Sequence, residues 1–184
     1  ICTSKTRCIV RLAAIDIGSN AARLLIAEVG HDITGKPLFN KLNLVRVPLR
    51  LGFAVFEKGE ISKEKRGMVL QTMNAYSHLM NAYGVDHIIA CATSAMRDAR
   101  NSEDLIRKIK LETGISIEII SGELEASIIY ENHIAENMDT DHSYLYIDVG
   151  GGSTELTFFA DGKLVFKESF NIGTIRLLKD MVDD

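Results

Sequence analysis

The chain has 184 residues, of which 46% are hydrophobic and 25% are charged, a composition that excludes extensive disorder and is typical of a globular protein. Its formal net charge is −4, and no cluster alternates lysine or arginine with aromatic residues, so nucleic acid is not expected as a partner. No apolar stretch approaches the roughly 20 residues that a membrane-spanning helix needs, so no membrane association is expected either.

The cysteines and the start of the chain bear on its location. Cys2, Cys8 and Cys91 form no CxxC pair and fit a reducing compartment better than a disulfide scaffold. The opening residues, "ICTSKTR", lack the apolar core of a signal peptide. We therefore expect a cytoplasmic protein. Because the chain opens on Ile1 rather than on Met, we also expect it to be a piece of a longer protein.

The first expected elements are three strands. Two short apolar runs, "CIVRLAAIDIG" and "ARLLIAEVG", predict a hairpin whose tip is Gly18, Ser19 and Asn20. The segment "KLNLVRVPLRLG" alternates in hydrophobicity and carries Pro48. This pattern predicts a third strand at the edge of a sheet.

Helices and strands are then expected to alternate. Apolar residues recur at helical spacing from Ser62, a capping residue, to Tyr83, and Gly84 ends the run. The following segments predict a strand, a helix capped by Ser102 and ended by Gly114, a strand and a helix: "DHIIACAT", "SEDLIRKIKLETG", "ISIEIIS" and "ELEASIIYENHIAENM".

The order βββαβαβα predicts an α/β fold with a ribonuclease-H-like mixed sheet and flanking helices. A polar segment follows, and a new strand begins at Tyr144. We therefore place a domain boundary near Asp139. Residues 1–138 are expected to form a first domain, and residues 139–184 the start of a second domain of the same type, too short for a core of its own.

One hairpin occurs twice. "AIDIGSNAARLLIA" and "YIDVGGGSTELTFFA" share an Ile-Asp pair, a β-branched residue, a glycine and a second apolar strand. Asp16 corresponds to Asp148, and Leu24 corresponds to Leu156 at the same offset. Only two copies at this long spacing indicate duplicated domains rather than a solenoid.

The residues after the glycines show which kind of loop this is. A dinucleotide-binding or P-loop turn opens onto a helix, whereas here "STELTFF" and, after an Asp161-Gly162 turn, a further strand follow. Backbone amides at such a tip can form an anion nest, and Asp16 and Asp148 could hold a hydrated divalent cation. Two purely structural hairpins remain the alternative.

The chain resembles a known family. Paired phosphate hairpins on duplicated domains are similar to those of the actin, sugar-kinase and heat-shock-chaperone superfamily. Within it, the chain resembles the exopolyphosphatase / guanosine pentaphosphate phosphohydrolase family through four motifs in order: "AAIDIGSNAARLLIA", "ATSAMRDARN", "IEIISGELEA" and "YIDVGGGSTEL". The second and third motifs are the more specific, because kinases and chaperones share the glycine hairpin.

This resemblance implies Mg²⁺-dependent release of the terminal phosphate of inorganic polyphosphate or guanosine pentaphosphate, in a cleft between two domains. It implies that Glu125 is the catalytic base for water and that Arg97 contacts a phosphoryl group. The implied phosphate-binding residues are Gly18, Ser19, Asn20, Arg23, Gly150, Gly151, Gly152 and Ser153. The implied metal ligands are Asp148 and Glu155, with Asp16 added by symmetry.

Each of these residues has a simpler interpretation. The helix dipole favours a carboxylate at Glu125 regardless of catalysis, Arg97 could pair with Asp98 or Glu103, and Arg23 could be solvated. Alternation along the strand could turn Glu155 outward. Two departures from the family pattern leave fewer polar side chains near the site. Residues 21 and 22 are both alanine, and residue 124 is leucine where many members have a second glutamate.

The fold class leaves other functions open. A kinase for sugars or acids would need a nucleotide-binding motif elsewhere and has no evident use for "SGELEA". A non-enzymatic sensor of guanosine tetra- and pentaphosphate would need only the cleft. Attraction of a polyanion to an acidic chain requires a local basic patch, for which Arg46, Arg50 and Arg97 are candidates. The preferred substrate and the oligomeric state, a homodimer included, are left open.

Overall fold

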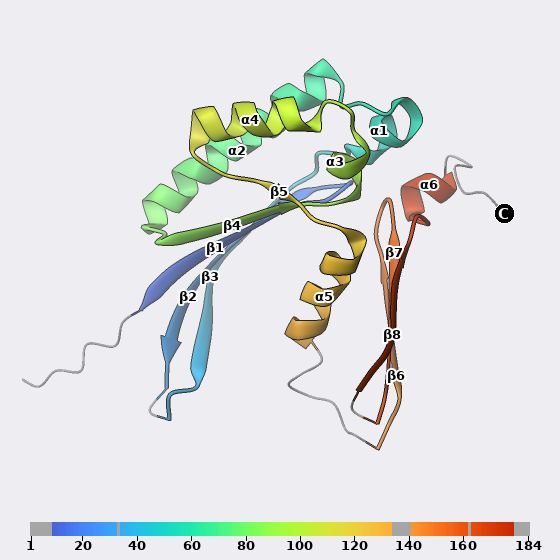
Figure 1. The fold of residues 1–184 in the computed structure, drawn as a ribbon. Helices are drawn as coiled ribbons and strands as arrows, with labels where there is room; N and C mark the ends of the chain where they lie inside the picture. The colour runs from blue at the N-terminus through green and yellow to red at the C-terminus, as the bar shows by residue number, and fades with distance from the viewer. Residues whose placement is uncertain (1–8, 33, 134–140, 162, 179–184) are drawn as a thin grey trace, which may run out of the picture.

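The computed structural model describes residues 9–32, 34–133, 141–161 and 163–178, and its larger part is a five-stranded sheet (Figure 1). The strands lie in the order β3-β2-β1-β4-β5. Their bounds are β1 (Val10–Ile17), β2 (Ala22–His31), β3 (Pro37–Val47), β4 (His87–Ala92) and β5 (Glu118–Ile119).

The sheet is mixed, as the sequence predicts. β2 pairs antiparallel with both β1 and β3, whereas β1, β4 and β5 are parallel neighbours. Asp16 lies opposite Cys91 and Ile17 opposite Ala92 in the parallel pair. The carboxyl ends of β1 and β4 therefore meet at one edge of the sheet, where the first glycine hairpin also lies.

Four helices follow the strands of this sheet: α1 (Gly52–Lys58), α2 (Lys63–Tyr83), α3 (Ser94–Asp98) and α4 (Ser102–Thr113). α2 and α4 lie side by side on one face of the sheet (Figure 1). The short helices α1 and α3 were not predicted, because 7 and 5 residues are too few to show a helical period.

The predicted ends of the long helices are mostly confirmed. The Ser62 hydroxyl accepts a hydrogen bond from the Lys65 amide at the start of α2, and Gly84 ends the helix in the left-handed conformation. Gly114 ends α4 in the same way. The predicted cap Ser102 is wrong: Asn101 occupies the cap position, and the Ser102 hydroxyl donates instead to the Ala99 carbonyl at 2.8 Å.

The hydrophobic core lies between the sheet and this helical layer. Ile17 and Leu24 of the sheet are fully buried, as are Met73 of α2 and Ile109 of α4. The Tyr76 hydroxyl reaches from α2 across the core and donates to the Ala22 carbonyl at 3.0 Å. α2 and the start of β2 are thus held in register beside the first hairpin. No helix of the described residues is long and apolar enough to cross a membrane.

A second, three-stranded antiparallel sheet is formed by β6 (Tyr144–Val149), β7 (Thr154–Ala160) and β8 (Lys163–Phe170), followed by α6 (Thr174–Leu178). α5 (Gly122–His133) lies between the two sheets and packs on β7 and β8 (Figure 1). The predicted boundary near Asp139 falls outside the described residues, and so does Gly162 of the predicted turn. The division into domains stays a prediction.

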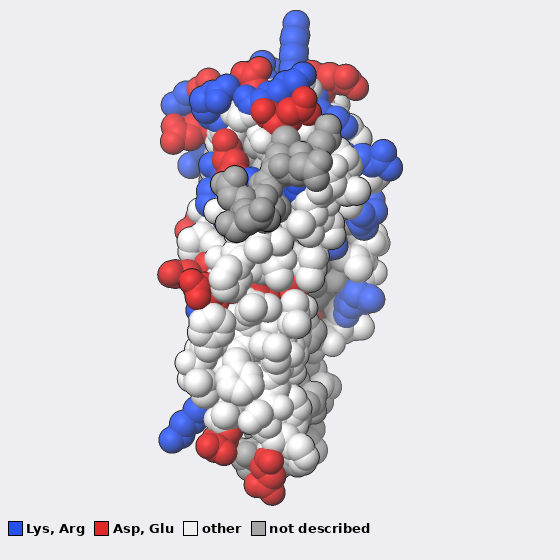
Figure 2. All heavy atoms as spheres, turned by 90° about the vertical axis from the view of Figure 1, so that its right-hand side faces the viewer, with Lys and Arg blue, Asp and Glu red and all other residues white. Residues whose placement is uncertain are grey.

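The outward face of the second sheet is apolar. Leu145, Ile147 and Val149 are each more than half exposed, and Phe166 adds to the same face from β8. Figure 2 looks onto this side and shows a broad surface without charged residues, which gather above and below it. A surface of this kind normally packs against further protein.

The two hairpins share one geometry. The Gly18 amide donates to the Ala21 carbonyl at 3.0 Å, and the Gly150 amide donates to the Ser153 carbonyl at 2.9 Å. Asp16 lies opposite Arg23 across the first hairpin, and Asp148 lies opposite Glu155 at the same places of the second. The repeat seen in the sequence is therefore also a repeat of hydrogen bonds.

The glycines of the second hairpin allow close packing rather than an unusual backbone. None of residues 150–152 has a positive φ. A Cβ on Gly151 would lie 3.1 Å from the Ser19 Cβ, and one on Gly152 would overlap Ser94 and Phe56 of the first sheet's layer. A Cβ on Gly173 would overlap the loop backbone itself, 2.5 Å from the Gly152 nitrogen.

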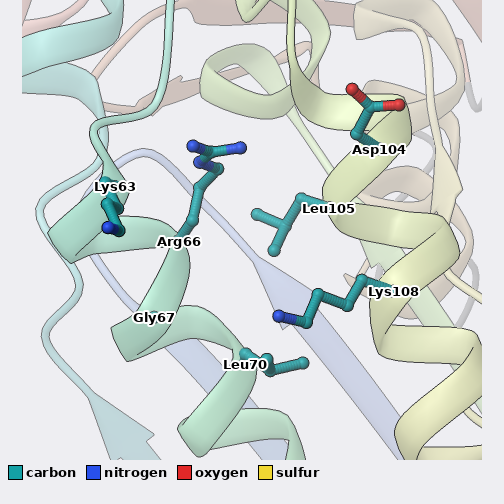
Figure 3. A pocket seen from close by; sticks show the side chains of 7 residues that line it. All are labelled: Lys63, Arg66, Gly67, Leu70, Asp104, Leu105 and Lys108. Carbon is teal, nitrogen blue, oxygen red and sulfur yellow. The ribbon is translucent and has the colours of Figure 1, made fainter.

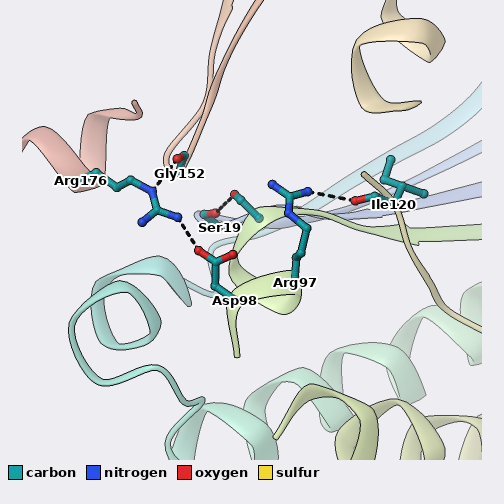
Figure 4. Close-up of polar contacts among 7 residues, drawn as sticks. Ser19, Arg97, Asp98, Ile120, Gly152 and Arg176 are labelled. Atoms are coloured by element: carbon teal, nitrogen blue, oxygen red, sulfur yellow. Dashed lines mark hydrogen bonds and ion pairs between the residues drawn. The ribbon is translucent and has the colours of Figure 1, made fainter. Parts of the chain in front are cut away.

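Arg176 of α6 joins the two parts of the molecule. Its Nε donates to the Gly152 carbonyl at 2.7 Å, and its guanidinium pairs with Asp98 of α3 (Figure 4). Its Cζ also lies 4.1 Å from the centre of the Phe56 ring. The Arg176 side chain is only 14% exposed. A partly buried, hydrogen-bonded pair of this kind fixes geometry more firmly than an exposed one.

We expect Gly173→Ala to destabilise the intact protein by about 1–3 kcal/mol, as overpacking does, because the new methyl group would overlap the backbone of the glycine loop. Denaturation in urea measures the effect. Gly67→Ala in α2 is the control, since nothing lies within 4 Å of a Cβ there, and it should be neutral or stabilising by up to about 1 kcal/mol. Equal stability of the two variants would contradict the proposed close approach.

Candidate active site between the two sheets

A pocket of about 180 Å³ lies where the two glycine hairpins face the start of α5. It brings together most of the residues that the sequence singles out. Its lining consists of Asp16, Gly18, Ser19, Asn20, Ala21, Arg23, Arg46, Thr93, Ser94, Glu125, Asp148, Val149, Gly150, Gly151 and Ser153. Both hairpins and the candidate base therefore open onto one space.

Three predicted site residues lie outside this pocket. Gly152 is buried against Ser94 and Phe56. Glu155 is 4% exposed and accepts a hydrogen bond from the Ser169 hydroxyl at 2.8 Å, so it faces inward rather than outward. Direct contact of Glu155 with a metal or of Gly152 with phosphate stays a prediction.

Arg97 is the third of these residues. It lines a neighbouring pocket of about 440 Å³ with Ser121, Lys167 and Ser169, on the other side of the start of α5. Its Nη1 donates to the Ile120 carbonyl at 2.9 Å (Figure 4). Asp98, one alternative partner for Arg97, pairs instead with Arg176. Contact of Arg97 with a phosphoryl group stays a prediction.

The first hairpin is tied to the end of β4 by residues that sequence reasoning missed. The hydroxyls of Ser19 and Ser94 are buried and lie 2.8 Å apart, and the Thr93 amide donates to the Ile17 carbonyl at 3.1 Å. The two residues that sequence reasoning missed, Thr93 and Ser94, belong to "ATSAMRDARN". Their position directly after a strand parallel to β1 is the signal that could have found them.

Backbone amides at the hairpin tips are available to an anion. The amides of Ser19, Asn20 and Gly151 have no hydrogen-bond acceptor among the described residues, and all three residues line the pocket. Successive unpaired amides of this kind form an anion nest. Binding of phosphate by these amides stays a prediction.

Two arginines supply positive charge at the pocket. Arg23 lies opposite Arg46 across β2 and β3, and both line it. The Arg23 Nη1 also lies 3.3 Å from the Asp16 Oδ2, in a pair that is about half exposed. Arg50 does not line the pocket; its amide donates to the Asn20 carbonyl at 2.8 Å and supports the hairpin tip from behind.

Carboxylates crowd the inner side of the pocket. Burial and, after it, the nearby charge of Glu155 raise the pKa of Glu125 to about 7, whereas Arg97 acts in the opposite direction. The Glu125 Oε2 is buried and has no hydrogen-bond partner among the described residues. Burial also raises the pKa of Asp16; Arg23 opposes this shift and Asp148 adds to it. This part of the pocket has more negative charge than its own cations offset.

The donor set fits a hydrated magnesium ion rather than a closed metal cage. In the described part of the chain, no three histidine, cysteine or acidic side chains converge closely enough to hold a metal by themselves. Mg²⁺ usually keeps several waters and binds through one or two carboxylates and substrate phosphates. Asp16 and Asp148 offer such carboxylates beside the amide nests.

Comparisons with known proteins relate the chain to phosphatases. The chain is 36% identical over 172 residues to a bifunctional 3-dehydroquinate synthase/phosphatase of Fusobacterium nucleatum, covering 90% of this chain and 25% of that protein. It is 29% identical over 175 residues to exopolyphosphatase 1 of Mycobacterium bovis, covering 95% of this chain and 50% of that one. The crystal structure of an exopolyphosphatase from Cytophaga hutchinsonii matches with a TM-score of 0.79 and 31% identity, over 92% of this chain and 53% of that one.

The chain thus spans about half the length of the two exopolyphosphatases that it matches. Residues 31–184 match the family model described as the Ppx/GppA phosphatase family, which is more than half of the chain. The family resemblance seen in the sequence and the mixed α/β fold agree with that match. The chain belongs to the Ppx/GppA phosphatase family.

Proposed function

We propose that the protein containing this chain hydrolyses the terminal phosphoanhydride bond of inorganic polyphosphate, and that Glu125 orients and deprotonates the attacking water. The observation that carries the proposal is the placement of Glu125: a half-buried carboxylate with one unpaired oxygen, lining the same pocket as two phosphate-type hairpins. Guanosine pentaphosphate presents a terminal phosphoanhydride of the same chemistry and is the second candidate substrate.

The pKa of Glu125 suits a general base. A base is most effective when its pKa lies near the working pH, and burial brings this carboxyl to about 7. The charges of Glu155 and Arg97 act on this pKa in opposite directions, Glu155 raising it and Arg97 lowering it. The unpaired Oε2 is free to accept a hydrogen bond from the attacking water.

The rest of the pocket supplies the electrostatic part of phosphoryl transfer. Free amides at Ser19, Asn20 and Gly151 would receive oxygens of the terminal phosphates, and Arg23 and Arg46 would meet those farther along the chain. Asp16 and Asp148 would hold Mg²⁺, which would supply positive charge to offset that of the phosphate oxygens. Positioned donors and an oriented water are the main requirements of this reaction.

Two competing functions make different demands on Glu125. A sensor of guanosine tetra- and pentaphosphate gains nothing from a carboxyl group whose pKa is near 7. Once ionised, that group would repel the polyanion and weaken its binding. A kinase would transfer the phosphoryl group to an acceptor hydroxyl rather than to water. Release of free phosphate therefore separates hydrolysis from both.

We expect Glu125→Gln to lower phosphate release by about 10²–10⁴-fold, the usual loss when a general base is removed. The assay measures release from polyphosphate and from guanosine pentaphosphate with Mg²⁺, using the intact protein. Glu123→Gln is the matched control, because Glu123 is an exposed carboxylate on the same helix, and it should keep most of the activity. Full activity of Glu125→Gln, or no release by the wild type from either substrate, would refute the mechanism.

The pKa of Glu125 also predicts a pH-dependent cost in stability. Its pKa is raised from 4.5 to about 7 on folding, so the stability associated with the protonated carboxyl is fully present below pH 4.5 and is lost as the pH rises to about 7. Because solvent reaches part of the side chain, we expect a cost of roughly 1–2 kcal/mol above pH 7, less than the whole shift implies.

Urea denaturation of wild type and Glu125→Gln at about pH 5 and about pH 8, with a metal chelator, measures this cost. The free energy of unfolding of the variant minus that of the wild type should be larger at about pH 8 than at about pH 5 by roughly 1–2 kcal/mol. Comparing two pH values cancels any pH-independent effect of the substitution. A difference that stays constant would show that Glu125 ionises as freely in the folded protein as in the unfolded chain.

A further inference from the structure

A second pocket, of about 370 Å³, lies between α2 and α4 (Figure 3). Its residues are Lys63, Arg66, Gly67 and Leu70 of α2 and Asp104, Leu105 and Lys108 of α4. None of them lines the candidate active site or the pocket beside it. It is therefore a separate site in the helical layer.

The pocket has a surplus of positive charge. Lys63, Arg66 and Lys108 contribute three cations. Asp104 is the carboxylate among its lining residues, and it is ion-paired with Arg107. Lys108 lies 3.8 Å from Glu112, in a pair that is largely exposed to solvent and therefore weak. The cations are not neutralised from within the pocket.

Arg66 carries an unmet hydrogen-bond donor. Its guanidinium extends into the space between the two helices (Figure 3), and its Nε is buried without a hydrogen-bond partner in the described part of the chain. A guanidinium cannot lose its proton to escape this cost. A buried N–H donor without an acceptor is unfavourable, so a ligand that supplied an acceptor to Nε would remove this cost.

The helices add to the positive potential. Lys63 and Arg66 lie in the first turn of α2, which has 21 residues, and Asp104 lies in the first turn of α4, which has 12, with Lys108 one turn farther along. The N-terminal end of each helix carries a partial positive charge, which disfavours cations there and favours anions. Lys63 and Arg66 therefore oppose the dipole of α2, whereas Glu64 in the same turn favours it.

Gly67 keeps the wall of the pocket open. Its φ is not positive, and a Cβ there would meet nothing within 4 Å. Neither backbone geometry nor packing therefore requires glycine in the interior of this long helix, where alanine would be more favourable. The absence of a side chain leaves room beside Arg66 and Lys63.

We propose that this pocket binds a compact anion with several linked phosphate groups, at a site separate from hydrolysis. The planar guanidinium of Arg66 suits two phosphate oxygens, and the two ammonium groups suit the neighbouring phosphates. Leu70 and Leu105 form an apolar floor beneath them. The site does not depend on the hydrolysis proposed above, because its residues have no part in the catalytic pocket.

The direct test is protection of lysine amines from an acylating reagent in the intact protein, read residue by residue by mass spectrometry, with tripolyphosphate as the probe. Tripolyphosphate should slow the labelling of Lys63 and Lys108 several-fold and leave the exposed Lys36 and Lys41 unchanged. Inorganic monophosphate at the same concentration should protect much less. Unchanged labelling of Lys63 and Lys108, or equal protection by monophosphate, would overturn the proposal.

A second measurement uses calorimetric titration of tripolyphosphate into Glu125→Gln protein, which does not consume the probe. Adding Lys63→Gln, Arg66→Gln and Lys108→Gln should abolish one binding event or weaken it at least about tenfold, since hydrogen bonds to charged groups are lost. The matched control, Lys36→Gln, Lys41→Gln and Lys163→Gln, removes the same charge from exposed positions and should bind as before. Identical titrations for the two triple variants would overturn the proposal.

The outcome is independent of the hydrolysis assay. If tripolyphosphate fails to protect Lys63 and Lys108 while phosphate release is normal, the proposed anion site is refuted and the proposed function is not. If Lys63 and Lys108 are protected but neither substrate releases phosphate, the proposed function is refuted and the proposed anion site is not.

Discussion

The close approach of the second glycine loop to the ends of β1 and β4 is the constraint on which the site depends. Gly151 and Gly152 come so near to Ser19 and Ser94 that no Cβ fits between them. This contact brings two hairpins, distant in sequence, to face one pocket of about 180 Å³. The same contact explains why α6 begins where it does, since the Ile175 amide donates to the Gly151 carbonyl at 2.9 Å.

The pocket concentrates carboxylates that the fold does not neutralise. Asp16 and Glu125 both have raised pKa values because burial and neighbouring acids disfavour their charge. A protein designed only for stability would replace such groups, since each buried charge without a partner weakens folding. Their cost is tolerated because the hydrophobic core between the first sheet and α2 and α4 stabilises the fold without these carboxylates.

The sequence predicts local features well and long-range ones poorly. The paired hairpins and the start and end of α2 follow from short signals such as a glycine after an Asp, a capping serine and a closing glycine. The burial of Glu155 could not be predicted from the sequence. Alternation along a strand defines two faces but does not show which of them α5 covers. The placement of Arg97 depends on the five-residue helix α3, and the packing of Gly152 depends on Phe56 and Arg176, which lie far from it in the chain.

The acidic net charge of the chain does not prevent binding of a polyanion. Exposed charges farther apart than about 8–10 Å are largely screened at physiological salt, so the groups close to a phosphate decide its affinity. Near the hairpins these are free amides with Arg23 and Arg46, and between α2 and α4 they are three cations around an unpaired donor. The two pockets differ in their carboxylates: Asp16, Glu125 and Asp148 line the first, whereas Asp104 is the carboxylate that lines the second. We therefore expect only the first to need a cation before it binds phosphate. An anion should therefore depend on Mg²⁺ for binding at the hairpins and not at Arg66.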